Sequence, residues 1–407
     1  MSTAQAPARP APTKKLNLYK GDPGMWSWVA HRISGVALAG ALALSACGSE
    51  SSDSATDSAK SAGSNATDAA KSGGDSGSAD CGKKDLKAEG SSAQDNAIQD
   101  AIEKYGKTCD NNVTYNATGS GNGIKQFIAG QVNFAGSDSA LKTKPKDGKI
   151  ETDEAKTACG SEAWNIPMVT GPIAVSYNLK DVKDPITLTP AVLADIFNGK
   201  ITKWNDPAIA AVNKGVTLPA KDIKVFFRSD ESGTTENFTK YLAASAKDKW
   251  TAEPGKKWTG KGEGKAKTAG VTSSVKSTDG GITYAEWSAA KDNELQVAKI
   301  DNGAGAVELT GASASKAISA AKIDGTGNDL RLKLDYATKE AGAYPIVLVT
   351  YEVVCSKYKD AEIGKSVKSF LTYFAGDDIQ KNLESQGYAP LPADIQGKVK
   401  TAVNAIQ

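Results

Sequence analysis

The segment from Ile223 to Thr235 reads IKVFFRSDESGTT, and it passes from apolar residues to polar ones within a few positions. Residues 223–227 form a short apolar run, as in a buried strand. Ser232 to Thr235 then supplies the small and hydroxyl-bearing residues that begin helices. We therefore predict a strand, a polar loop headed by Arg228, and a helix from about Thr235.

The same alternation extends along most of the chain. Strand patterns occur at 86–89, 113–116, 173–177 and 346–351, and helical spacing of apolar residues occurs at 97–105, 124–128, 191–197, 362–374 and 393–405. Short strands that alternate with helices are typical of α/β proteins. The predicted fold class is therefore α/β.

Two further loops share the character of the first. Gly90-Ser91-Ser92-Ala93 lies between a predicted strand and a helix, and so does Gly119-Ser120-Gly121-Asn122-Gly123. The start of a helix offers free backbone N–H groups and the positive end of the helix dipole, which together favour an anion. A single loop of this kind is usually an ordinary helix cap. Three of them together with an arginine predict an anion-binding site.

Charge and histidine content exclude several classes of function. The 407 residues include 49 Lys and Arg, 47 Asp and Glu, and one histidine, His31. Without residues 1–46 the chain keeps 44 basic and 46 acidic residues, a net charge of −2. A nearly neutral body argues against nucleic acid as a partner. A chain without His31 has no imidazole for a Ser-His-Asp triad or a zinc site, and we expect no metal and no catalytic residues.

The N-terminal residues have the pattern of an export signal. Basic residues precede a short apolar run at 33–46, which suits a signal peptide better than a membrane span. The run ends in Leu-Ser-Ala-Cys at 44–47, which resembles the lipobox of bacterial lipoproteins and predicts lipidation of Cys47. Residues 48–80 are rich in Ser, Ala, Gly and Asp and predict a tether without a core. Residues 19–35 resemble the start of a succinate dehydrogenase cytochrome b subunit, but the likeness stops at Gly35.

The three loops resemble those of the phosphate-binding protein of the bacterial Pst ABC transporter, in its actinobacterial form. The likeness runs from about Cys81 to the C-terminus and includes NFAGSD at 133–138, DIFNGKITKW at 195–204 and GYAPLP at 387–392. It implies a type II periplasmic-binding-protein fold, in which two α/β lobes are joined by a two-strand hinge. The expected ranges are a leader at 1–46, the lipidated cysteine and tether at 47–80, the first lobe at 81–173 and 346–407, and the second lobe at 174–345.

The resemblance also implies a function and a set of ligand-binding residues. It predicts a lipid-anchored monomer on the extracytoplasmic face that binds inorganic phosphate, has no cofactor, and delivers phosphate to the permease and ATPase subunits of the transporter. The implied phosphate-binding residues are Ser92, Ala93 (through its backbone N–H), Ser120, Asp138, Arg228, Ser232, Gly233 and Thr234, with Asp230 holding Arg228 in place.

Asp138 is informative because a carboxylate beside an anion is unfavourable unless the ligand brings a proton. An ionised carboxylate only accepts hydrogen bonds, so it can pair with a P–O–H group. Sulfate has no such proton at neutral pH and would be repelled. The alternative roles are an ordinary loop cap for Asp138, a site for another oxyanion, or a phosphatase with Ser232 as nucleophile.

The cysteines fit an exported protein. With Cys47 lipidated, Cys81, Cys109, Cys159 and Cys355 make an even number, and they lack the CxxC spacing of metal sites. Four cysteines allow three pairings. The positions of Cys81 before the first strand and Cys109 after the first helix favour Cys81–Cys109 together with Cys159–Cys355.

Overall fold

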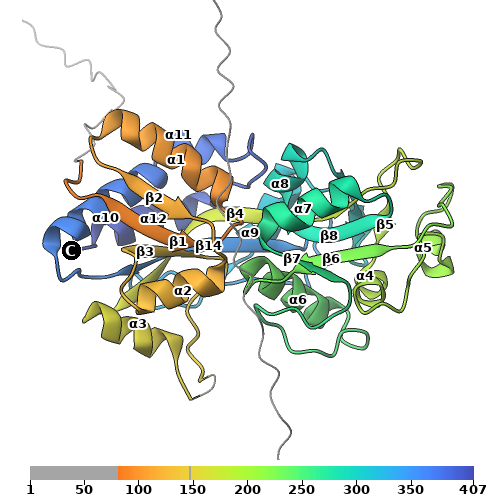
Figure 1. Ribbon diagram of the computed structural model, residues 1–407, viewed down its shortest axis with the longest axis horizontal. Coiled ribbons are helices and arrows are strands. Elements are labelled where there is room, and N and C mark those ends of the chain that lie inside the picture. Colours follow the sequence, from red (N-terminus) through yellow and green to blue (C-terminus); the bar gives the residue numbers. More distant parts are fainter. Residues whose placement is uncertain (1–80, 146–147) are drawn as a thin grey trace, which may run out of the picture. The chain divides into compact units, whose positions relative to one another are not determined.

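The computed structural model describes residues 81–145 and 148–407. The expected leader at 1–46, the lipid attachment at Cys47, the tether at 48–80 and the resemblance at 19–35 therefore lie outside the described residues. Within the described ranges strands and helices alternate along the chain, and the predicted α/β class is confirmed (Figure 1).

One mixed sheet runs through the fold. Its strands follow the order β2-β1-β3-β14-β4-β8-β6-β7, and β9 pairs with β4. Their bounds are β1 (Leu86–Gly90), β2 (Val113–Asn116), β3 (Phe134–Ser137), β4 (Ala163–Tyr177), β6 (Lys224–Arg228), β7 (Glu263–Lys265), β8 (Gly281–Glu286), β9 (Gln296–Val297) and β14 (Val347–Cys355). β1 is parallel to β2 and β3, and β6 is parallel to β7 and β8, whereas β4 and β14 run antiparallel to their neighbours.

β4 and β14 are the two long strands in the middle of the sheet (Figure 1). They pair from Ala163 with Cys355 to Pro172 with Val347. Every residue of β14 is buried, and such strands have near-continuous apolar sequences, which made this strand recognisable. The sequence located β4 only at 173–177, whereas the strand begins at Ala163, because Asn165 and Pro167 interrupt its apolar run.

The helices fall into two groups, according to the strands beside which they lie (Figure 1). The first group is α1 (Asp95–Thr108), α2 (Ser120–Ile128), α3 (Glu151–Cys159), α10 (Ala361–Phe374), α11 (Asp377–Asn382) and α12 (Ala393–Asn404). The second group is α4 (Pro190–Phe197), α5 (Pro207–Ala211), α6 (Gly233–Ser245), α7 (Lys267–Ser277), α8 (Trp287–Asp292) and α9 (Gly311–Ser319). Two small sheets complete the fold, formed by β5 (Thr187–Leu188), β10 (Lys299–Asp301) and β11 (Ala306–Val307), and by β12 (Lys322–Ile323) and β13 (Leu332–Lys333).

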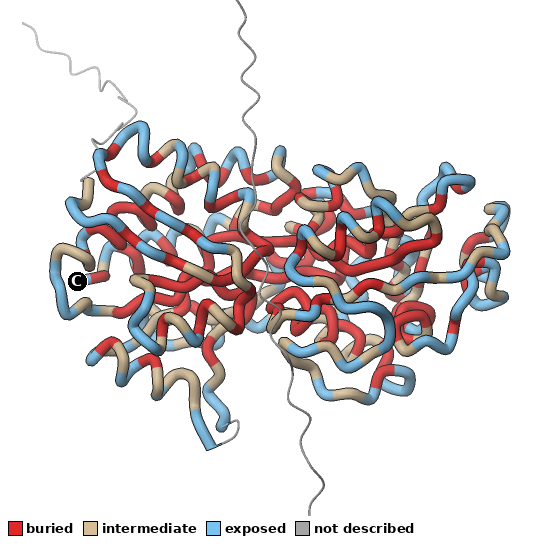
Figure 2. Tube along the Cα trace, viewed as in Figure 1, coloured by how far each residue is buried: buried red, intermediate tan, exposed pale blue. Residues whose placement is uncertain are grey.

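Separate apolar cores underlie the two groups, and buried segments run through both (Figure 2). One core contains Phe134, Phe370 and neighbouring residues of the first group, with a smaller cluster around Phe127 beside it. The other contains Trp204, Phe238 and neighbouring residues of the second group. We call the parts around these cores the first lobe and the second lobe; β4 passes from one core to the other between Val169 and Ile173.

The segment that carries β12 and β13 packs differently from the rest of 174–345. Leu330 belongs to the first core, its backbone N–H donates to Asn165 O at 3.0 Å, and the Leu332 N–H donates to the Tyr351 hydroxyl at 3.0 Å. This segment was placed in the second lobe by its position in the sequence, yet these contacts are with the first lobe. Sequence order alone could not show this excursion.

Two disulfide bonds lie in the first lobe, and they have the pairing that the sequence favoured. Cys81 is bonded to Cys109, just after α1, and Cys159 at the end of α3 is bonded to Cys355 at the end of β14. Among residues 81–145 and 148–407, none of the helices combines the length and the apolar composition that crossing a membrane would require.

Candidate functional site

The carboxyl ends of four strands meet where the two lobes are in contact. β1 and β3 end at Gly90 and Ser137 in the first lobe, and β6 and β8 end at Arg228 and Glu286 in the second. Ligands of open α/β sheets usually bind at the carboxyl ends of strands. The residues predicted to bind the anion lie at the ends of these strands, in the loops that follow them, or in the first turns of α2 and α6.

Helices α2 and α6 begin at this contact, and glycine allows their first turns to approach the opposite lobe. The Gly121 N–H donates to Glu231 O at 2.9 Å. A Cβ atom added to Gly121 would lie 2.5 Å from the Glu231 Cβ, and one added to Gly233 would lie 2.5 Å from the Asp138 Cβ. The positive ends of both helix dipoles therefore face a narrow space between the lobes.

Asp138 is buried in the first lobe with three hydroxyl donors. Its Oδ1 accepts from Ser91 Oγ and from Thr350 Oγ1, the latter at 2.8 Å, and its Oδ2 accepts from Ser120 Oγ at 2.9 Å. Burial and then the negative charge of Glu286 raise the pKa of Asp138 to about 6. Asp138 is therefore ionised at neutral pH and is held as a hydrogen-bond acceptor.

Arg228 is the buried cation of the second lobe, with 2% of its surface exposed. Its Nε donates to Asp230 Oδ1 at 2.7 Å and its Nη2 donates to Asp230 Oδ2 at 2.5 Å, so the pair is bidentate. This contact agrees with the predicted task of Asp230, which fixes the plane of the guanidinium. The remaining nitrogen, Nη1, donates to Thr234 Oγ1 at 3.4 Å and to Thr268 Oγ1 at 3.2 Å.

The other predicted residues lie around the same space. Ser232 is the N-cap of α6, and its Oγ accepts from the Thr235 N–H at 3.2 Å. Thr234 Oγ1 donates to Glu286 Oε1. Ser92 Oγ lies 2.8 Å from Thr268 Oγ1, across the gap between the lobes. The Ala93 N–H, by contrast, donates to Ser91 Oγ at 2.9 Å.

Four residues of this constellation were not identified from the sequence: Ser91, Thr268, Glu286 and Thr350. Ser91 directly follows β1 and Glu286 ends β8, and these positions at the ends of strands could have indicated both residues. Thr268 is the second residue of α7, which follows β7, so a hydroxyl again lies where a helix begins after a strand. Thr350 lies inside β14, and nothing in the local sequence separates it from a core residue.

Charged contacts join the lobes beside this site. Glu236 in α6, with 1% of its side chain exposed, accepts from Ser139 Oγ at 3.0 Å and pairs with Lys142, both from the first lobe. Lys240 and Lys256 also lie within 2.8 and 3.4 Å of its carboxylate. Although burial opposes it, the three lysines hold the pKa of Glu236 well below its usual range.

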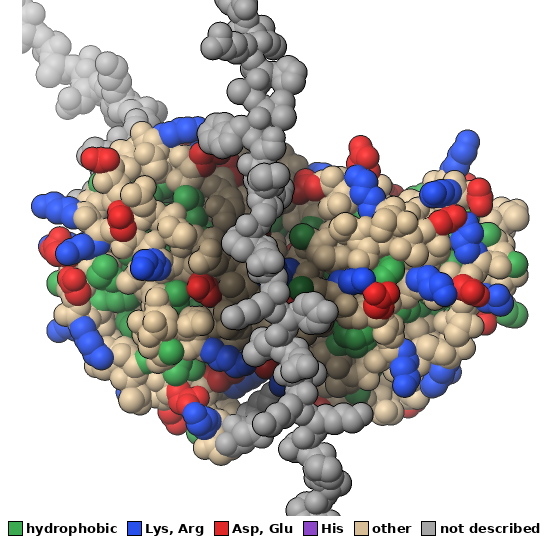
Figure 3. Space-filling model, in the orientation of Figure 1, with side chains coloured by type: hydrophobic (Ala, Val, Ile, Leu, Met, Phe, Trp, Pro, Cys, Tyr) green, Lys and Arg blue, Asp and Glu red, His purple; other side chains and the backbone are tan. Residues whose placement is uncertain are grey.

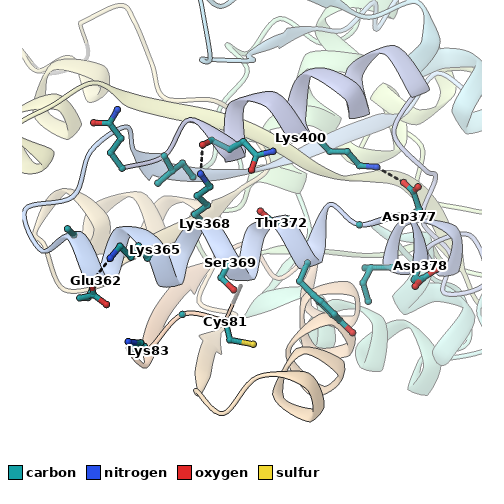
Figure 4. A pocket seen from close by; sticks show the side chains of 18 of the residues that line it. Cys81, Lys83, Glu362, Lys365, Lys368, Ser369, Thr372, Asp377, Asp378 and Lys400 are labelled. Carbon is teal, nitrogen blue, oxygen red and sulfur yellow. Dashed lines mark hydrogen bonds and ion pairs between the residues drawn. The ribbon is translucent and has the colours of Figure 1, made fainter. Parts of the chain in front are cut away.

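Cavities on the described residues differ in their relation to the site. One of about 400 Å³ lies between the lobes, and its lining includes Ser92 and Thr268. A larger one, about 1340 Å³, lies beside α10 and α11 of the first lobe (Figure 4). The ion pair of Lys400 with Asp377 lies at its wall, and none of the predicted anion-binding residues lines it. The predicted site therefore adjoins the first cavity.

A family model described as a PBP superfamily domain matches residues 48–378. Phosphate-binding protein PstS 3 of Mycobacterium tuberculosis is 46% identical over 379 residues, covering 91% of this chain and 97% of its own. PstS of Haemophilus influenzae is 34% identical over 309 residues, covering 73% and 86%.

The chain belongs to the PstS family of the PBP superfamily.

Solved structures agree with this assignment at the level of the fold. A high-affinity periplasmic phosphate-binding protein, PfluDING, matches with a TM-score of 0.63 at 22% identity, over 78% of this chain and 93% of its own. A phosphate-binding protein from Stenotrophomonas maltophilia matches with a TM-score of 0.58 at 21% identity, over 78% and 94%. The predicted type II periplasmic-binding fold is confirmed for this PstS-family chain.

Proposed function

We propose that this protein binds inorganic phosphate between its two lobes and delivers it to a Pst-type ABC importer. The observation that carries the proposal is the convergence of Arg228 with the first turns of α2 and α6 around the buried acceptor Asp138. A dehydrated oxyanion needs many donors to replace water, and helix N-termini with one guanidinium provide them. The names of the family relatives, all phosphate-binding proteins, support the same ligand.

The charges of the site favour phosphate over sulfate. Asp230 balances the charge of Arg228, so Asp138 adds a net negative charge next to the ligand. An anion that brings a P–O–H proton converts this repulsion into a hydrogen bond, whereas sulfate cannot. The phosphate ligands in this proposal are Ser92, the Ala93 N–H, Ser120, Asp138, Arg228, Ser232, Gly233 and Thr234.

Calorimetric titration with phosphate and with sulfate tests the proposal. We expect one phosphate per chain and no heat from sulfate at neutral pH. Asp138→Asn should bind sulfate, because its amide can donate, while Asp292→Asn on the cavity wall should still reject it. In the wild type, sulfate binding should appear only below about pH 6, where Asp138 becomes protonated. A protein that binds neither anion, or an Asp138→Asn variant that still excludes sulfate, would contradict the assignment.

The remaining features of the proposal concern anchoring and movement. In this proposal the protein is a monomer. A lipid on Cys47 anchors it to the extracytoplasmic face of the membrane, and residues 48–80 form the tether. The lobes, 81–173 with 346–407 and 174–345 without the β12–β13 segment that packs on the first lobe, close around phosphate by bending at β4 and β14. Where the face in Figure 3 is uncovered, acidic and basic side chains are interspersed on both lobes. Cys47→Ser should release the protein from the membrane fraction, and retention there would contradict the anchor.

A further inference from the structure

Glu286 is a buried carboxylate at the proposed phosphate site, and the function proposed above gives it no task. It ends β8, and 1% of its surface is exposed. Its Oε1 accepts from Thr234 Oγ1, and its Oε2 accepts from Thr268 Oγ1 at 2.7 Å. Arg228 Nη1 donates to the same two hydroxyl oxygens. Glu286 thus fixes the direction in which both hydroxyl protons point.

A hydroxyl group has only one proton to donate. Because the Thr234 proton is on the hydrogen bond to Glu286, the Thr234 oxygen presents a lone pair to the space at the start of α6. The predicted role of Thr234 is the opposite one, a donor to the anion. If the hydroxyl simply turned, Glu286 Oε1 would be left buried, charged and without a donor, next to a second anion.

We propose that Glu286 takes up one proton when phosphate binds, and so converts Thr234 into a donor. The proton, taken from the buffer, bonds to Glu286 Oε1. The Glu286 hydroxyl then donates to Thr234 Oγ1, and the freed Thr234 proton points to a phosphate oxygen. Thr268 continues to donate to Oε2, so the carboxyl group keeps two hydrogen bonds. One hydrogen bond reverses, and no other bond has to break.

The groups that face Glu286 fit this proton balance. Arg228 comes from β6 and is paired with Asp230. Thr234 and Thr268 lie in the first turns of α6 and α7, Asp138 follows β3, and Tyr388 follows α11. Two carboxylates, Asp138 and Glu286, thus lie near the incoming anion, and the guanidinium of Arg228 is already paired with Asp230. The charge of Glu286 raises the pKa of Asp138. Neutralising Glu286 therefore also keeps Asp138 ionised as the acceptor for the P–O–H group.

Proton uptake on binding is measured by calorimetry with inorganic phosphate in two buffers of different ionisation enthalpy. About pH 8 is suitable, because free phosphate is then mostly HPO4²⁻ and Asp138, with a pKa of about 6, is ionised. We expect the wild-type full-length protein to take up about one proton per phosphate, and its affinity to fall about tenfold per pH unit above this pH. Glu286→Gln should take up almost none and lose the pH dependence, because its amide already donates to Thr234.

Two further variants separate the outcomes. Thr234→Val removes the hydroxyl whose hydrogen bond must reverse, so it should also abolish proton uptake. This variant tests the inference if Glu286→Gln does not fold. Asp292→Asn changes a carboxylate of the cavity wall and should keep the wild-type uptake. Phosphate binding without proton uptake, or uptake that survives Glu286→Gln, would overturn the inference and leave the proposed function standing. A wild type that gives no heat with phosphate would refute the proposed function itself, on which the inference rests.

Discussion

Gly233→Ala offers a direct test of lobe closure at the site. Gly233 is the first residue of α6, and its backbone is helical, so alanine suits it locally. The added Cβ would lie 2.5 Å from the Asp138 Cβ and 2.5 Å from Ser120 Oγ, both in the first lobe. Side-chain Cβ atoms do not approach other atoms so closely. The lobes of the variant must therefore stay farther apart than in this structure.

The size of the effect follows from the cost of that overlap. Forcing an extra methyl group into a packed contact typically costs about 1–3 kcal/mol. The cost applies only to the closed arrangement, so it lowers the fraction of molecules that can bind. The phosphate dissociation constant should then rise about 5–150-fold. The open protein should lose no stability, because replacing glycine in a helix by alanine is favourable by about 0.5–1 kcal/mol.

The assay is calorimetric titration with phosphate, accompanied by thermal unfolding of the same samples. Gly397→Ala is the matched control, because it lies in α12 and its added Cβ would meet no atom within 4 Å. It should gain a similar helix stabilisation and keep the wild-type affinity. A folded Gly233→Ala variant with unchanged phosphate affinity would refute the reasoning, since it would show that binding does not require this contact.

Three further predictions concern other residues. Burial raises the pKa of Glu352 to about 8, so the folded protein holds a proton that the unfolded chain releases. The free energy of unfolding should therefore fall by a few kcal/mol between about pH 5 and 8. In urea titrations Glu352→Gln should remove the part of this decline above about pH 6, whereas Asp138, with a pKa of about 6, still contributes below it. Glu236→Gln should weaken the contact with Lys142, raising the phosphate dissociation constant and the radius of gyration in solution scattering. Replacing both Cys159 and Cys355 by serine removes a disulfide bond between residues that are 196 positions apart in the chain. The free energy of unfolding should fall by about 2–5 kcal/mol, because the unfolded chain is no longer constrained.

The sequence predicted those parts of the fold in which local pattern and tertiary environment agree. Residues 346–351 are apolar because β14 is buried on both faces, and α6 begins directly after Ser232 because the Ser232 hydroxyl caps the helix. β4 was only half recognised, because its pairing with β14 overrides the interruption by Asn165 and Pro167. The excursion that places Leu330 against the first core depends on contacts distant in sequence, which no local pattern encodes.

The same distinction explains what could be anticipated of the site. Arg228, Asp230, Ser232 and Thr234 are close in sequence, so one motif indicates them together. Glu286 is more than fifty residues from Thr234 in the chain, and it reaches that hydroxyl only because β8 and β6 are neighbours in the sheet. A sequence motif can thus identify a hydroxyl as part of a site without showing which way its proton points. That direction depends on the buried carboxylate that accepts the proton. In an anion-binding site it decides whether the hydroxyl donates to the anion or faces it with a lone pair.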